Sequence, residues 1–123
     1  MTTVLICDDR RGVREGLTRV MSAVPGVSRI DCVAHGDELL ARYSRAPVDV
    51  VLVGDLFYER PLAERVLAFV QAAHKGGAEV LVGDPRRSYF PSDRFRQVAL
   101  YSVPVTRELE DAEIKRSAVW RLA

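Results

Sequence analysis

The sequence predicts an α/β domain built on a mostly parallel sheet with helices on both of its faces. Apolar runs of strand length alternate with segments of helical spacing through most of the chain, an alternation typical of parallel sheets. Two β-rich runs replace the helices in the last third. The 123 residues suit one domain with one core, and the sequence has no internal repeat, low-complexity tract or obvious linker. We therefore expect a single three-layer α/β/α domain.

The first half is expected to alternate strand, helix, strand, helix, strand. These elements fall at residues 4–7, 13–24, 27–33, 36–44 and 48–53. The first helix is predicted by apolar residues at helical spacing, and Pro25-Gly26 ends it. The run 48–53 is continuously apolar, which is typical of a central parallel strand buried on both faces.

The second half is expected to add one helix, one strand and an antiparallel pair. Pro61 opens the helix at its first turn, where proline is tolerated. Its inner face is predicted to carry Leu62, Val66, Phe69, Val70 and Ala73. Residues 74–77 end it, because cations suit the negative helix end and glycine permits a left-handed cap. A strand follows at 79–83, and the acidic stretch 107–113 joins β-rich runs at 95–105 and 114–122.

Charge and composition argue against several classes of partner. The net charge is +1, so no strong field would draw the chain to nucleic acid or to a membrane surface. No apolar run approaches the roughly 18 residues of a spanning helix, and no basic leader precedes the first strand. We expect a cytoplasmic protein with neither nucleic-acid nor membrane partners. Cys7 and Cys32 lie in strand-like runs and are expected to be buried, reduced thiols.

Residues 1–53 resemble the receiver domain of bacterial response regulators, of the type followed by a helix-turn-helix output domain. The resemblance rests on Val-Leu-Ile-Cys-Asp-Asp at 4–9, Val-Arg-Glu-Gly-Leu at 13–17, Gly-Asp-Glu-Leu-Leu at 36–40 and Asp-Val-Val-Leu-Val at 49–53. It implies a flavodoxin-like fold. It also implies a phosphorylation site with an acidic pair that holds Mg²⁺, an acceptor aspartate, a hydroxyl residue and a lysine.

The receiver site is incomplete in this sequence. Asp8 and Asp9 match the acidic pair, but the acceptor position falls on Gly54. Asp55 is one residue late, and a shift of one residue in a strand turns the side chain to the other face. The hydroxyl and lysine positions have no counterpart. The resemblance therefore implies at most a weak Mg²⁺ site formed by Asp8, Asp9 and Asp55, because hard cations prefer oxygen ligands.

Residues from about 50 to the end resemble class I S-adenosylmethionine methyltransferases that modify protein lysines, the electron-transfer-flavoprotein group. The resemblance rests on Val-Gly-Asp-Leu-Phe-Tyr-Glu-Arg-Pro-Leu at 53–62, Val-Leu-Val-Gly-Asp-Pro-Arg-Arg-Ser-Tyr at 80–89, Val-Pro-Val-Thr-Arg-Glu-Leu-Glu at 103–110 and Val-Trp-Arg-Leu at 119–122. It implies a Rossmann-like sheet. What survives is the substrate side of such an enzyme, with Asp55, Tyr58 and Glu59 as vestigial catalytic candidates beside Asp84 and Arg86.

The cofactor side of such a methyltransferase has no match. Binding needs a glycine-rich turn after the first strand and an acid at the end of the second, which holds the ribose hydroxyls. Here the first strand leads into Asp-Asp-Arg-Arg-Gly at 8–12, and the second ends in Val-Ala-His at 33–35. We therefore expect no cofactor, apart from weakly bound Mg²⁺.

The two resemblances meet at residues 50–54, where both families have an apolar strand that runs to an acid. Together they imply one Rossmann-like or flavodoxin-like sheet with strand order 2-1-3-4-6-5 and strand 6 antiparallel. One domain would then consist of a receiver-like half, 1–53, and a methyltransferase-like half, 54–123.

Three hypotheses about function follow from these resemblances. The first is a recombinant or designed chimera, a folded scaffold that is not an enzyme and has no evolved catalytic activity. The second is an atypical receiver that acts through protein partners without phosphorylation. The third is a remnant methyltransferase. Because the methyltransferase half lacks elements it would normally pack against, exposed apolar surface favours self-association into a dimer.

Overall fold

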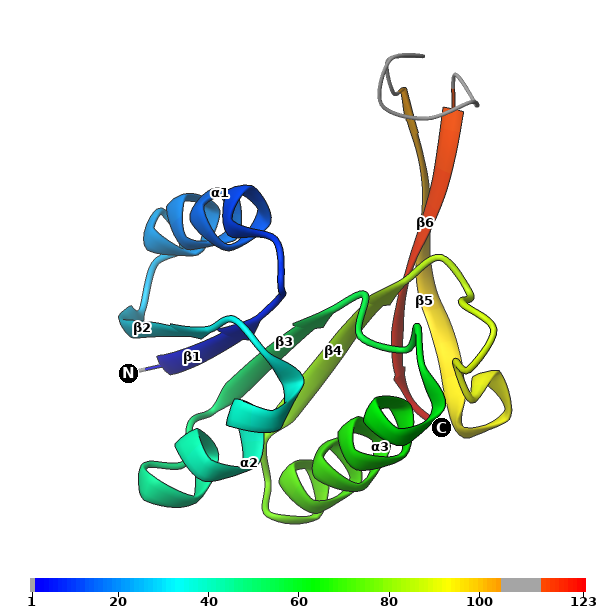
Figure 1. Cartoon of the computed structure of the whole chain (residues 1–123). Coiled ribbons are helices and arrows are strands. Elements are labelled where there is room, and N and C mark those ends of the chain that lie inside the picture. The colour runs from blue at the N-terminus through cyan, green and yellow to red at the C-terminus, as the bar shows by residue number, and fades with distance from the viewer. Residues whose placement is uncertain (1, 105–113) are drawn as a thin grey trace.

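The structure, a computed structural model, describes residues 2–104 and 114–123 and is built on one six-stranded sheet (Figure 1). The strands are β1 (Thr2–Cys7), β2 (Val27–Val33), β3 (Val50–Gly54), β4 (Glu79–Asp84), β5 (Phe95–Pro104) and β6 (Ile114–Leu122). The helices are α1 (Arg11–Ser22), α2 (Gly36–Arg45) and α3 (Arg60–Lys75), with a 3₁₀ turn at Ser92–Arg94.

The strand order is β2-β1-β3-β4-β6-β5, which confirms the predicted sheet and its α/β fold class. β1 pairs in parallel with β2 and β3, and β3 pairs in parallel with β4. β6 runs antiparallel to both of its neighbours, as expected. The acidic stretch 107–113, predicted to join β5 to β6, lies outside the described residues.

The main core lies between the sheet and the layer of α2 and α3 (Figure 1). Every second residue of β3 and β4 is buried there, including Val51, Val53, Val80 and Val82. All five residues predicted for the inner face of α3 are buried. Gly77 closes that helix with φ +101, the left-handed conformation that glycine adopts without strain. No helix among the described residues is long and apolar enough to cross a membrane.

The opposite face of the sheet is covered only in part. In Figure 1, α1 lies over β1 and β2, and no described helix lies over β3 and β4 on that side. Val50 and Leu52 of β3 are consequently only half-buried, so the expectation of a strand buried on both faces is wrong. α1 itself has no fully buried residue. A continuous apolar run cannot reveal how many helices are present to cover it.

β5 and β6 form a ribbon that continues beyond the rest of the sheet (Figure 1). β6 pairs with β4 only from Ala118 to Trp120, but it pairs with β5 from Ile114 to Leu122. The ribbon is anchored by an aromatic cluster of Phe57, Phe90, Phe95 and Trp120. Residues 114–117 of β6 pair with β5 but not with β4. Because β6 is antiparallel to β4, this part of the ribbon projects past the carboxyl end of β4.

Candidate functional site

The carboxyl ends of β1 and β3 mark the place where an open α/β sheet of this order usually binds ligands. The chain leaves β1 for β2 on one side and later returns to β3 on the other, so the two strands flank a topological switch point. Ligands of such sheets bind in the crevice outside these strand ends. Asp8 follows β1 directly, and Asp55 follows β3.

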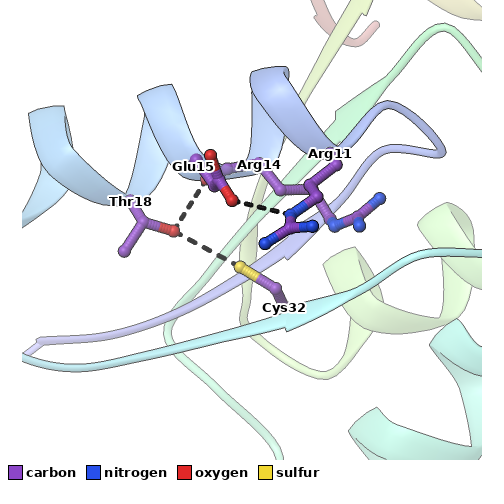
Figure 2. Close-up of a pocket in the computed structure, with 5 residues that line it drawn as sticks. All are labelled: Arg11, Arg14, Glu15, Thr18 and Cys32. Atoms are coloured by element: carbon purple, nitrogen blue, oxygen red, sulfur yellow. Dashed lines mark hydrogen bonds and ion pairs between the residues drawn. The ribbon is translucent and has the colours of Figure 1, made fainter.

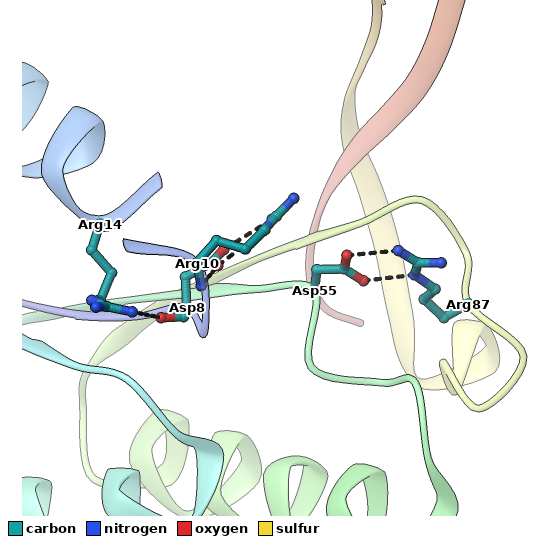
Figure 3. Close-up of polar contacts among 5 residues, drawn as sticks. All are labelled: Asp8, Arg10, Arg14, Asp55 and Arg87. Atoms are coloured by element: carbon teal, nitrogen blue, oxygen red, sulfur yellow. Dashed lines mark hydrogen bonds and ion pairs between the residues drawn. The ribbon is translucent and has the colours of Figure 1, made fainter. Parts of the chain in front are cut away.

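Asp8 is fully buried and held by its own loop (Figure 3). Its Oδ1 accepts a hydrogen bond from the Arg10 backbone N–H at 2.8 Å, and the Arg10 guanidinium reaches both carboxylate oxygens at 3.1 Å. Arg14 donates to the Asp8 carbonyl oxygen at 2.8 Å. On the other side, a Cβ added to Gly54 would overlap Asp8 Oδ2. The Asp8 carboxylate therefore occupies the space that a side chain at position 54 would take.

Asp55 turns away from Asp8 toward the loop after β4 (Figure 3). Its φ is +49, a left-handed conformation that aspartate tolerates better than most residues. The Asp55 N–H still donates to the Gly83 carbonyl oxygen at 2.8 Å. Its carboxylate meets Arg87 in a two-point pair, with both N···O distances at 2.8 Å. Because β3 ends at Gly54, the backbone at Asp55 is free to leave the extended conformation, and the Asp55 side chain points toward Arg87.

Asp84 organises the loop that carries Arg87. Its side chain is fully buried, and its Oδ1 accepts the Arg87 backbone N–H at 2.7 Å. The Trp120 indole N–H donates to the Asp84 carbonyl oxygen at 3.0 Å and so ties β6 to the same turn. Burial raises the pKa of Asp84 above its ordinary value. The strand ends of β3, β4 and β6 are thereby joined through Asp55, Arg87, Asp84 and Trp120.

The predicted Mg²⁺ ligands are not gathered at one point. Asp8 pairs with Arg10 and Asp55 pairs with Arg87, while Asp9 is exposed. Over residues 2–104 and 114–123, no group of three or more His, Cys, Asp and Glu side chains is placed to hold a metal ion. The weak magnesium site stays a prediction.

The vestigial catalytic candidates lie along one loop between β3 and α3. Asp55 is mostly covered and contacts Arg87, with 13% of its side chain exposed. Tyr58 is about half exposed, at 49%, and partial burial with nearby carboxylates raises its pKa. Glu59 is exposed and occupies the N-cap position of α3 without a side-chain cap. Their catalytic role stays a prediction.

Sequence reasoning missed the arginines and the packing role of Gly54. Arg10 lies two residues after Asp8, close enough for a loop to fold back on its own carboxylate, and that spacing was a usable signal. The pairing of Arg87 with Asp55 spans 32 residues, and nothing local in the sequence points to it. Gly54 matters because the Asp8 side chain rests against it, which a sequence pattern does not show.

A separate cavity of about 340 Å³ lies between α1 and β2 (Figure 2). It is lined by Arg11, Arg14, Glu15, Thr18 and Cys32. The Thr18 hydroxyl lies 3.4 Å from the Cys32 sulfur, and Cys32 is exposed. The expectation of two buried thiols is therefore wrong for Cys32, whose side chain lines this open pocket, and holds only for Cys7.

The two thiols are expected to react very differently with iodoacetamide at pH 8. Burial, followed by the charge of Asp8, raises the pKa of Cys7 to about 12. About one Cys7 in 10⁴ would then be a thiolate at this pH, and the thiolate is the reactive form. Mass spectrometry of the native protein should show one alkyl group. Cys32→Ser should accept none until denaturant is added, and rapid labelling of native Cys32→Ser would contradict the burial of Cys7.

Comparisons with known proteins point to methyltransferases. No protein-family model matches the chain. The chain is 33% identical over 78 residues to the electron transfer flavoprotein beta subunit lysine methyltransferase of Danio rerio. This match covers 59% of the chain and 30% of the Danio rerio protein. The Xenopus laevis protein of the same name is 29% identical over 91 residues, covering 70% of this chain and 37% of that protein. The chain thus spans about a third of the curated relatives that it matches.

Among solved structures, the chain is similar to the M1A22 tRNA methyltransferase TrmK of B. subtilis. The TM-score is 0.44 at 9% sequence identity, and the match covers 98% of this chain and 60% of that one.

These matches overturn the main hypothesis drawn from the sequence. The prediction of an inert, recombinant scaffold is wrong, and so is the alternative of an atypical receiver, because the relatives found are methyltransferases. A match over 70% of the chain cannot fit within residues 50–123, which make up about 60% of it. The similarity therefore crosses the expected join and enters the supposed receiver half. The methyltransferase resemblance is supported, and the receiver resemblance is not.

Proposed function

We propose that the chain is a remnant of a class I methyltransferase domain, which keeps the substrate side of the fold and does not itself bind S-adenosylmethionine. The similarity to two protein-lysine methyltransferases supports the ancestry. The loop after β1 supports the loss of cofactor binding, and that loop is the single observation that carries the proposal.

The residues after β1 do not fit the cofactor. The turn places the exposed carboxylate of Asp9 where the carboxylate of S-adenosylmethionine would lie, and two like charges repel each other. The fully buried Asp8 side chain, clamped by Arg10, fills the space over Gly54 at the switch point. At the end of β2, Val33, Ala34 and His35 offer no carboxylate for ribose hydroxyls. On this proposal the isolated chain is not an enzyme.

The proposal predicts that S-adenosylmethionine and S-adenosylhomocysteine do not bind. Isothermal titration calorimetry should give no saturable heat up to about 1 mM ligand, and the melting temperature should not move. A ligand with a Kd of 10 µM would instead stabilise the fold by about 2.7 kcal/mol at that concentration.

A saturable heat anywhere in this concentration range would overturn the proposal. If the natural chain does not bind, Asp8→Ala is the informative variant, because it removes the carboxylate that fills the switch point. If the variant binds the cofactor and the natural chain does not, Asp8 is the obstacle. Equal failure of both means that removing the Asp8 carboxylate is not enough to restore cofactor binding.

A further inference from the structure

The outer edge of β5 is an open strand edge. β5 is the last strand of the sheet, and β6 is its only neighbour among the described strands. Its ten residues exceed the usual five to six of a strand. Backbone N–H and C=O groups along its free side are thus available to another strand. Proteins normally protect such an edge with charges, prolines, bulges or a covering element.

The residues of this edge carry almost none of those protections. Val98 and Leu100 are 42% and 53% exposed. The sequence of 98–103, Val-Ala-Leu-Tyr-Ser-Val, has no charge, glycine or proline and is rich in strand-forming residues. Arg96 and Pro104 lie only at or beyond the two ends of this stretch. The pairing register of β5 with β6 shifts once, between Gln97 and Ala99.

The opposite edge of the sheet differs in this respect. β2 carries Arg29 and Asp31, which pair with each other at 2.9 Å, and Asp31 also contacts Arg42 of α2. Charged side chains of this kind discourage strand addition. Of the two edges, β5 is therefore the one open to a partner strand, and an assembly through it stops at two copies.

We propose that β5 is a dimerisation edge whose partner is β5 of a second copy of this chain, paired antiparallel about a two-fold axis. Identical strands that run antiparallel form an isologous interface, which closes at a dimer. A register centred on Leu100 places Arg96 opposite Pro104 of the second copy, so no like charges face each other. The uncharged stretch then pairs with itself, and the two sheets become one continuous sheet.

Sedimentation equilibrium of three proteins tests this edge. The natural chain should show a concentration-dependent monomer–dimer equilibrium. Leu100→Lys places two lysines opposite each other at the axis and should weaken the dimer at least tenfold. Leu40→Lys is the matched control, because Leu40 on α2 is similarly exposed at 57% but lies far from β5 in the fold, and it should leave the equilibrium unchanged.

A mixing experiment tests the register. Leu100→Glu alone should also be monomeric, whereas a one-to-one mixture of Leu100→Lys and Leu100→Glu should regain dimers, since opposite charges then meet at the axis. A natural chain that stays monomeric at high concentration overturns the proposal. So does a dimer that Leu100→Lys leaves intact, one that Leu40→Lys weakens equally, a charge-swapped mixture that stays monomeric, or growth beyond two copies.

Discussion

Truncation of Phe57 to alanine should lower the free energy of unfolding by about 4 kcal/mol, because removal of a fully buried aromatic ring leaves a cavity. Phe57 has no exposed surface, and its ring lies 5.2 Å from that of Phe90 and 6.3 Å from that of Phe95, centroid to centroid. The substitution removes one of the four rings of the aromatic cluster that anchors the ribbon, together with its contacts to Phe90 and Phe95. Urea unfolding followed by circular dichroism measures the change.

The next residue supplies the control. Tyr58 is 49% exposed, so Tyr58→Ala should change the free energy of unfolding by about 0.5 kcal/mol or less. The two variants test the orientation of the loop after β3 as well as its burial. Equal losses in both would mean that this loop does not direct Phe57 inward and Tyr58 outward.

Gly54→Ala should destabilise the fold by about 3 kcal/mol, although the substitution adds a single methyl group. The new Cβ would overlap Asp8 Oδ2, and the buried carboxylate could move only by breaking its contacts with Arg10. Overpacking and the loss of a buried ion pair each cost a few kcal/mol. The same urea titration, with the slope compared between variants, measures the loss.

Two further variants separate this clash from the general effect of replacing glycine. Gly16 in α1 has open space where a Cβ would lie, so Gly16→Ala should raise stability by about 0.5–1 kcal/mol. Adding Asp8→Ala to Gly54→Ala removes the clash, so the double variant should be more stable than Gly54→Ala alone. Additive losses at positions 8 and 54 would show that the two side chains do not compete for space.

Local periodicity was enough to predict most of the helices and strands. α3 carries its apolar residues at helical spacing between an N-terminal Pro61 and a C-terminal glycine pair, and each of these signals acts within a few residues. The strand order followed from two resemblances, one of which the matches do not support. Because the two families are expected to share the order of their central strands, the unsupported receiver resemblance still gave the observed strand order.

The candidate site depended on contacts that sequence patterns do not encode. Asp8 and Asp55 both follow apolar strands, and in the structure those two strands are parallel neighbours. Their partners were not predictable in the same way, since Arg87 is 32 residues from Asp55 and the fit of Asp8 over Gly54 is steric. Acids that end buried strands are common to many α/β folds, so those two positions could not distinguish a receiver from a methyltransferase.

The sparse packing of α1 has a consequence for how the fold holds together. Its contacts are with β1 and β2, and none of its side chains is fully buried, so little of the apolar area that stabilises the chain belongs to it. The helices on the other face lie over the sheet's main hydrophobic cluster. The protein should therefore open in two stages, with a peripheral foldon containing α1 that melts at a lower free energy than the remaining cooperative unit.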